Sequence, residues 1–181
     1  MGCKLKKTVV FVGMMGAGKT AVGKALASRL KVPFLDSDAE IERAAARTIP
    51  EIFARDGEAF FRLKESQVIE RLLDSRCGVL STGGGAFMSD HNRHILSSRG
   101  VAVWLDAHLP LLWQRVRHKD SRPLLRTPDP LGTLRALYDL RVPVYAQADL
   151  RVKVEPRYSI EETAEHVVQA LLTRPDVLEA A

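Results

Sequence analysis

Short apolar segments alternate with longer segments of helical periodicity along the chain. Residues 8–12 form an apolar, β-branched run, and the next segment, 19–30, places Val22, Leu26 and Leu30 on one stripe of a helix. Four further apolar runs follow, at 32–35, 78–80, 101–105 and 150–154. This alternation predicts an α/β fold, with a five-stranded parallel sheet flanked by helices in three layers.

A long helical pattern occupies residues 39–73, between the second and third predicted strands. Within it, Thr48 precedes a first-turn proline and is followed by Glu51, which is the spacing of a capping box at a helix start. Gly57 marks a second break. We therefore expect an interrupted helical insertion here.

The C-terminal part of the chain carries one irregular segment and one further helix. Residues 117–130 are polar and basic and contain three prolines, which predicts a mobile surface segment. A helix is expected from Ser159, with Glu162 as its capping-box partner. No linker or internal repeat divides the 181 residues, so we expect a single domain, 1–181.

The composition indicates a water-soluble protein that binds anionic ligands. Charged residues make up 27% of it, and no apolar run approaches the roughly 20 residues needed to span a bilayer. The net charge of +5 comes from basic residues spread along the chain, which suits substrates with phosphates and carboxylates. Two distant cysteines, Cys3 and Cys77, fit a reducing compartment. We expect a cytoplasmic protein that binds neither membrane nor nucleic acid.

The strongest motif is the octapeptide 13–20, Gly-Met-Met-Gly-Ala-Gly-Lys-Thr, a full match to the P-loop pattern. It leaves a predicted strand and enters a predicted helix, as the motif requires. Its glycines let successive N–H groups converge on phosphate oxygens, and the helix N-terminus adds its positive end. Lys19 is expected to reach the β- and γ-phosphates, and the Thr20 hydroxyl to ligate Mg²⁺. The residues predicted to bind the triphosphate are Gly16, Ala17, Gly18, Lys19 and Thr20.

A P-loop alone does not separate kinases from GTPases or mechanical ATPases. GTPases usually recognise guanine with an Asn-Lys-x-Asp segment, and here the only asparagine, Asn92, is followed by Arg93. The chain is also too short to carry the extra modules of a motor. A small kinase is therefore favoured.

Two carboxylates follow the second predicted strand, in the sequence Asp36-Ser37-Asp38. Residues two apart on a strand point to the same side, so both carboxylates are expected to face the crevice at the carboxyl edge of the sheet. One could hold Mg²⁺ through water, and the other could orient or deprotonate a hydroxyl. Alternatively, either aspartate, Asp38 above all, caps the following helix.

Four further motifs occur beside the P-loop and the two aspartates. They are 60–65 (Phe-Phe-Arg-Leu-Lys-Glu), 81–85 (Ser-Thr-Gly-Gly-Gly), 122–125 (Arg-Pro-Leu-Leu) and 141–145 (Arg-Val-Pro-Val-Tyr). In this order and spacing, the set resembles the shikimate kinase family over almost the whole chain. The resemblance implies an enzyme of P-loop kinase fold that transfers the γ-phosphate of ATP, with Mg²⁺, to the 3-hydroxyl of shikimate. It also implies that residues 39–73 bind substrate and that 117–130 form a lid over ATP.

The resemblance also implies roles for residues on the acceptor side. The aspartate matching Asp38 contacts the acceptor hydroxyls and is the proposed base, and the one matching Asp36 helps to position Mg²⁺. Arg62 and Arg141 match the arginines that clamp the shikimate carboxylate, which suits a planar, bidentate guanidinium. Alternatively, Arg62 forms an i, i+3 surface pair with Glu65, and Arg141 is a solvated helix residue.

The loop Gly83-Gly84-Gly85 follows the third predicted strand. Three consecutive glycines fit a backbone that a ligand must approach closely. The resemblance makes Gly84 a substrate contact, and we expect all three glycines to line the substrate site.

Several arginines are candidates for contacts with the nucleotide. The resemblance implies that Arg122, in the lid, places positive charge on the transferring phosphoryl group in the manner of an arginine finger. Arg115 and Arg117 are both candidates, and the choice between them stays open. Arg157 is expected near the adenine end. The expected catalytic residues are thus Asp38, Lys19 and Arg122.

Three alternative functions remain open. The first is a kinase of the same fold with another acceptor, such as gluconate or a nucleoside monophosphate, although an arginine pair suits a carboxylate better than a base. The second is a module that binds nucleotide without turnover. The third is a nucleic-acid binder, suggested by the pI near 9.4, whose affinity would fall steeply with salt. We favour the interpretation that the protein is a monomer and that its substrates are ATP and shikimate.

Overall fold

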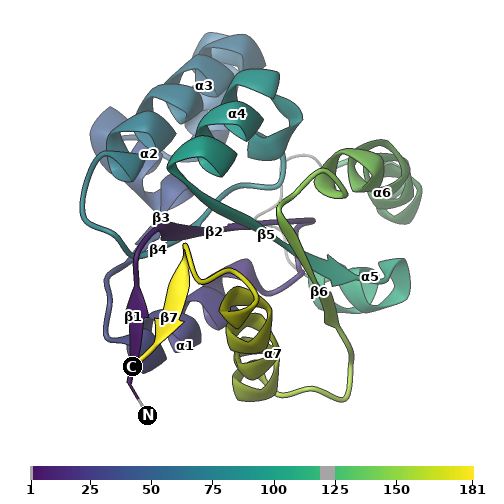
Figure 1. The fold of residues 1–181 in the computed structure, drawn as a ribbon. Coiled ribbons are helices and arrows are strands. Elements are labelled where there is room, and N and C mark those ends of the chain that lie inside the picture. The colour runs from purple at the N-terminus through teal and green to yellow at the C-terminus, as the bar shows by residue number, and fades with distance from the viewer. Residues whose placement is uncertain (1, 119–124) are drawn as a thin grey trace.

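A five-stranded parallel sheet forms the centre of the molecule (Figure 1). The computed structural model describes residues 2–118 and 125–181. The strand order is β3-β4-β2-β5-β6, and all four neighbouring pairs are parallel. The strands are β2 (Thr8–Val12), β3 (Phe34–Asp36), β4 (Val79–Ser81), β5 (Gly100–Ala107) and β6 (Leu150–Val154). The predicted number and direction of strands are confirmed, with ends shifted by one or two residues.

Helices cover both faces of this sheet, which confirms the three predicted layers. In Figure 1, α3 and α4 lie above the sheet and α1 and α7 below it, while α5 and α6 lie beside β6. The short 3₁₀ helix η1 (Ala86–Met88) follows the glycine loop. The helices are α1 (Lys19–Leu30), α2 (Ser37–Ala45), α3 (Ile49–Leu73), α4 (Asp90–Arg99), α5 (Leu109–Val116), α6 (Pro130–Tyr145) and α7 (Ile160–Leu172).

The three inner strands, β4, β2 and β5, are buried along their whole length. This is expected where helices cover both faces of a parallel sheet. The predicted stripe of Val22, Leu26 and Leu30 on α1 is buried in the same core. Because all strands are parallel, the loops after β2, β3 and β4 meet at one edge of the sheet, where α/β proteins bind ligands.

The helical insertion is broken at the two predicted points. Thr48 caps α3 by accepting a hydrogen bond from the N–H of Glu51 at 3.3 Å. Gly57 interrupts α3 with φ of 85°, in the left-handed region that favours glycine. At α7, Ser159 and Glu162 form the predicted capping box in both directions.

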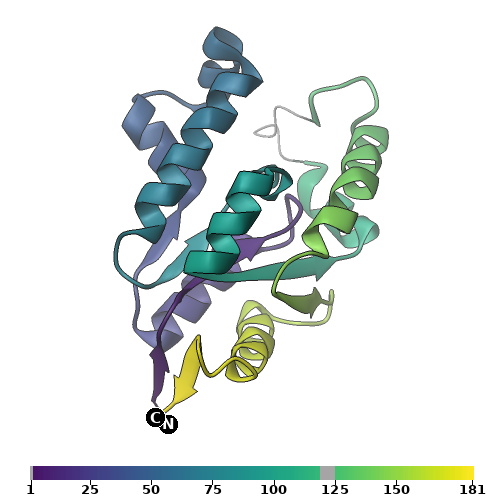
Figure 2. The same cartoon turned by 45° about the horizontal axis from the view of Figure 1, so that its top comes forward.

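A second, two-stranded antiparallel sheet was not predicted from the sequence. β1 (Cys3–Leu5) pairs with β7 (Leu178–Ala180), so the two ends of the chain lie together (Figure 2). Lys6 forms an ion pair with Glu179 at 2.9 Å beside it. The pairing joins the two ends of the chain, which no local sequence pattern specifies, and this is why it was missed.

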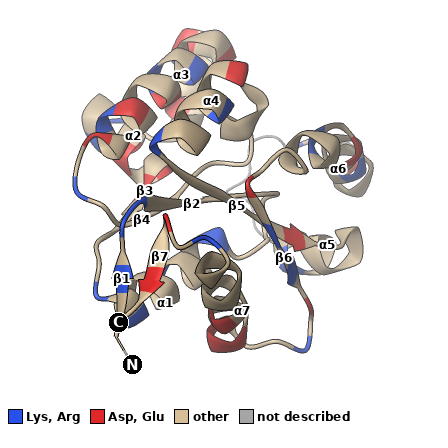
Figure 3. Cartoon of the chain, viewed as in Figure 1, with Lys and Arg blue, Asp and Glu red and all other residues tan. Residues whose placement is uncertain are grey.

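Charged residues are spread over the surface. Figure 3 shows lysine and arginine on most elements, interspersed with aspartate and glutamate. Within the described parts of the chain, none of the helices has both the length and the apolar character required to cross a bilayer.

Candidate active site

The P-loop connects β2 to α1, and its shape depends on glycine. Gly16 and Gly18 have φ of 85° and 99°, which L side chains rarely adopt. A Cβ on Gly16 would also lie 2.8 Å from the Cγ1 of Val116, which belongs to α5. The loop therefore wraps tightly around the N-terminus of α1, as a phosphate-binding nest requires.

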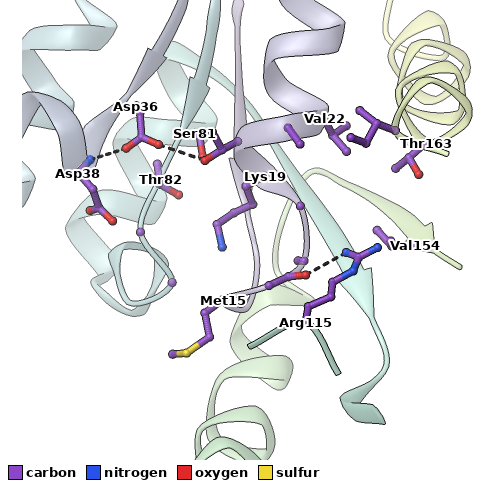
Figure 4. A pocket seen from close by; sticks show the side chains of 18 of the residues that line it. Met15, Lys19, Val22, Asp36, Asp38, Ser81, Thr82, Arg115, Val154 and Thr163 are labelled. Carbon is purple, nitrogen blue, oxygen red and sulfur yellow. Dashed lines mark hydrogen bonds between the residues drawn. The ribbon is translucent and has the colours of Figure 1, made fainter. Parts of the chain in front are cut away.

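A cavity of about 490 Å³, here called the P-loop cavity, lies against this loop. Lys19 is buried and donates hydrogen bonds to the carbonyls of Gly13 at 2.6 Å and Met14 at 2.9 Å. Figure 4 shows Lys19 extending into this space, with Asp38 on one side and Arg115 on the other. All five predicted triphosphate-binding residues line the cavity: Gly16, Ala17, Gly18, Lys19 and Thr20.

Asp36 connects the P-loop helix to the start of α2. Its Oδ1 accepts hydrogen bonds from the N–H groups of Asp38 at 2.9 Å and Ala39 at 3.2 Å. Its Oδ2 accepts a hydrogen bond from the Thr20 hydroxyl at 3.2 Å. Two hard oxygen donors, of the kind that Mg²⁺ prefers, thus lie together at the rim of the P-loop cavity.

Asp36 and Asp38 both line the P-loop cavity, as expected, but strand alternation is not the reason. β3 ends at Asp36, and α2 begins at Ser37 because the Asp36 carboxylate satisfies the first free amides of the helix. The helix cap is thus Asp36 and not Asp38. Asp38 instead lies in the first turn of α2, and its carboxylate faces the glycine loop.

A second cavity of about 510 Å³, here called the arginine cavity, lies between α3, α6 and the glycine loop. Arg62 of α3 and Arg141 of α6 both line it. Arg141 is only 5% exposed, so the alternative that it is a solvated helix residue is wrong. Two cations from helices far apart in the sequence therefore face one cavity.

Arg62 is held by a buried carboxylate. Its Nη1 donates a hydrogen bond to Glu65 Oε1 at 2.9 Å, which confirms the i, i+3 pair. The pair is not a surface pair, however, because Glu65 is 1% exposed. Burial raises the pKa of Glu65 to about 7, although the Arg62 guanidinium opposes this shift.

Each residue of the glycine loop leaves room for a side chain of the site. An added Cβ would lie under 3.0 Å from that side chain in all three cases. The pairs are Gly83 with Asp38, Gly84 with Arg141 and Gly85 with Arg62. None of the three glycines has a positive φ, so it is this space rather than backbone conformation that excludes a larger residue. The side chains that approach the backbone of this loop closely are therefore those of the protein itself.

The P-loop cavity and the arginine cavity meet at four residues. Met15, Asp38, Gly83 and Gly84 line both of them. Asp38 is the only titratable residue in this group. The site thus places one carboxylate between a phosphate-binding loop and a pair of guanidinium groups.

The predicted nucleotide arginines have different positions in the structure. Arg115 lines the P-loop cavity and donates a hydrogen bond to the Gly16 carbonyl at 2.9 Å, and burial lowers its pKa. Arg117 is exposed beside His118, and Arg157 is exposed and pairs with Glu155 at 2.8 Å. The geometry therefore favours Arg115 over Arg117. Arg122 lies in the range 119–124, outside the described residues.

Sequence reasoning missed three residues that help to build the site. Arg126, from the described end of segment 117–130, lines the arginine cavity, and Met15 lines both cavities. Tyr145 of α6 donates a hydrogen bond from its hydroxyl to the Gly84 carbonyl. Tyr145 stands four residues after Arg141, the spacing that puts two side chains on one face of a helix, and this spacing could have identified it.

Asp106 has a structural partner. Its carboxylate accepts a hydrogen bond from the Nε of Arg151 at 2.8 Å, at the carboxyl end of β5.

A P-loop on a parallel sheet, facing a second cavity lined by three arginines, defines the class of P-loop kinases that act on small anionic molecules. Within this class, the family model described as shikimate kinase matches residues 15–172. The chain belongs to the shikimate kinase family.

Individual relatives agree with this assignment. Shikimate kinase of Ruegeria pomeroyi is 66% identical over 175 residues, which cover 97% of this chain and 90% of the relative. Shikimate kinase of Cereibacter sphaeroides is 67% identical over 176 residues, covering 97% and 88%. Among solved structures, shikimate kinase from Acinetobacter baumannii in complex with shikimate is 40% identical, with a TM-score of 0.86 and coverage of 92% and 93%.

Proposed function

We propose that this protein transfers the γ-phosphate of ATP to the 3-hydroxyl of shikimate, with Asp38 at the point of transfer. The observation that carries the proposal is that Asp38 lines both cavities. A phosphate donor in the P-loop cavity and a carboxylate-bearing acceptor in the arginine cavity would meet at this residue. The relatives named shikimate kinase support the same reaction.

On the donor side, the P-loop amides and the N-terminus of α1 would bind the phosphates. Lys19 would exchange the carbonyls of Gly13 and Met14 for oxygens of the β- and γ-phosphates. Arg115 would flank the nucleotide from α5. Arg122 and Arg157 stay predicted nucleotide contacts, and residues 117–130 stay the predicted lid.

Mg²⁺ fits the oxygen donors at the rim of the P-loop cavity. Thr20 and Asp36 supply a hydroxyl and a carboxylate in contact with each other, and Mg²⁺ usually takes one or two such ligands together with phosphate oxygens and water. When bound, the ion would neutralise charge on the β- and γ-phosphates.

On the acceptor side, Arg62 and Arg141 would bind the carboxylate of shikimate. Each guanidinium can donate two parallel hydrogen bonds to a carboxylate, which sets both affinity and orientation. Asp38 would accept a hydrogen bond from the reacting hydroxyl and hold it in line with the γ-phosphorus. Because phosphoryl transfer is largely dissociative, positioning contributes more than basicity, so Asp38 need not be a strong base.

Gluconate is the main competing acceptor, because it also carries a carboxylate. A nucleoside monophosphate is disfavoured, since the second cavity offers three guanidinium groups, those of Arg62, Arg126 and Arg141, which suit a carboxylate. We further propose that the protein acts as a monomer in the cytoplasm. Cys3 and Cys77 are free thiols, which fits a reducing compartment.

A direct assay tests the proposal. Purified protein with Mg²⁺ and ATP should release ADP when shikimate is added, and only at a background rate with gluconate or without an acceptor. Well-folded protein that fails to respond to shikimate would refute the substrate assignment. A response to gluconate of equal size would move the assignment to that acceptor.

A further inference from the structure

The glycine loop presents a structural problem that the proposed function does not solve. Its three glycines make room for Asp38, Arg141 and Arg62. Glycine, however, has more backbone freedom than any other residue, so three in a row form a poorly defined segment. A loop that lines a substrate cavity needs a fixed shape, and that shape must come from contacts with its neighbours.

Tyr145 supplies such a contact. It is 0% exposed at the end of α6, and its hydroxyl donates a hydrogen bond to the carbonyl of Gly84, the central glycine. Its ring lies between Phe87 of η1, at a centroid distance of 6.5 Å, and Trp104 of β5, at 6.2 Å. The phenol is therefore packed against two elements, η1 and β5, that follow the loop in the chain.

The hydrogen bond determines the orientation of a whole peptide group. The peptide unit is planar and trans, so a fixed Gly84 carbonyl also fixes the Gly85 N–H on the opposite side. Without this bond, the Gly84–Gly85 peptide could rotate at little steric cost.

Tyr145 is also linked to the cation on its own helix. Arg141 stands one turn before Tyr145, and an added Cβ on Gly84 would lie 2.9 Å from Arg141 Nη1 and 3.6 Å from the Tyr145 hydroxyl oxygen. Burial raises the pKa of Tyr145 to about 12, with Arg141 opposing the shift, so the phenol stays protonated and remains a donor.

We infer that Tyr145 is a positioning residue for the acceptor site, holding the Gly84 peptide and the Arg141 guanidinium in the geometry that binds the substrate carboxylate. The inference rests on the proposed function, because it assumes that shikimate occupies the arginine cavity. It assigns to Tyr145 no contact with the reacting atoms.

Tyr145→Phe tests this inference, because it removes the hydroxyl and keeps the ring between Phe87 and Trp104. The KM for shikimate should rise about 5- to 30-fold, the range for loss of one buried hydrogen bond, while the KM for ATP stays within twofold. Amide hydrogen exchange at residues 83–86 should become faster. Tyr138→Phe is the matched control on the same helix, because Tyr138 lies near Asp106 and Arg151, and it should change none of these values.

Three outcomes would overturn the inference. The first is an unchanged KM for shikimate together with unchanged exchange at 83–86 in the Tyr145→Phe protein. The second is a rise in both KM values by the same factor. The third concerns Phe87→Leu, which loosens the packing of the Tyr145 ring but keeps the Tyr145 hydroxyl. If this variant raised the KM for shikimate as much as Tyr145→Phe does, the effect would come from ring packing and not from the hydrogen bond. Unaltered protein that does not respond to shikimate would refute the proposed function, whereas the exchange data would still decide whether Tyr145 holds the loop.

Discussion

Gly85→Ala should impair shikimate binding without harming the fold. Gly85 has φ of −90° and ψ of −7°, which alanine adopts without strain. The added Cβ would, however, overlap the Arg62 guanidinium, with three of its atoms under 3.0 Å away. The obstruction is the flexible end of a side chain, so the guanidinium moves and the backbone stays in place.

The size of the effect follows from what the displaced guanidinium loses. A hydrogen bond to a charged group contributes roughly 1.5–3 kcal/mol, and about 1.4 kcal/mol corresponds to a factor of ten in affinity. The KM for shikimate should therefore rise about 10- to 100-fold. The melting temperature should stay the same or rise slightly, because alanine restricts the unfolded chain more than glycine does.

The assay is ADP release with shikimate varied at saturating ATP, and then with the two substrates exchanged, alongside thermal unfolding. The decisive comparison places the same substitution in an Arg62→Ala background. If Gly85 matters only because it makes room for Arg62, then Gly85→Ala should add less than about a twofold change there, since coupled residues are not additive. An equal loss in both backgrounds, or a matching rise in the KM for ATP, would refute this reasoning.

Two further predictions concern the carboxylates of the site. Asp38→Asn should lower kcat by about two orders of magnitude, the usual range for general acid–base groups, and should change the KM for ATP little. Near-normal turnover would exclude Asp38 from the mechanism. Glu65 should make stability depend on pH: its folded-state pKa of about 7 lies above the ordinary 4.5, so between these values the folded state keeps a proton that the unfolded chain has lost. The free energy of unfolding should therefore fall by roughly 1–3 kcal/mol as pH rises through this window, and urea titrations of a Glu65→Gln variant should show a flatter profile. Parallel profiles for the two proteins would contradict the assignment.

The parts of the site that local patterns determine could be predicted from the sequence. The P-loop is one continuous motif between a strand and a helix, and it lies where the pattern puts it. At Asp36, strand alternation and helix capping predict different structures, and capping prevails because it satisfies two backbone amides at once. The spacing from Arg141 puts Tyr145 on the same helix face, but its partner, the Gly84 carbonyl, lies in a distant loop that no local pattern specifies. Arg126 was missed because its importance comes from a cavity formed across the fold.

Asp36 contributes to both the donor side and the acceptor side of the site, because each of its two carboxylate oxygens serves one side. Its two carboxylate oxygens have separate partners: Oδ1 holds the first turn of α2, and Oδ2 faces Thr20. In the proposed mechanism, Mg²⁺ would draw on Oδ2 and the Thr20 hydroxyl. The cap through Oδ1 would then remain, and with it the position of Asp38 two residues later. A serine at position 36 would have one side-chain oxygen, which could cap α2 or bind the metal, but not both. Binding of the metal would then remove the cap and shift Asp38, the residue that orients the acceptor. The bifunctional carboxylate would thus keep Asp38 in place when the nucleotide and its metal bind.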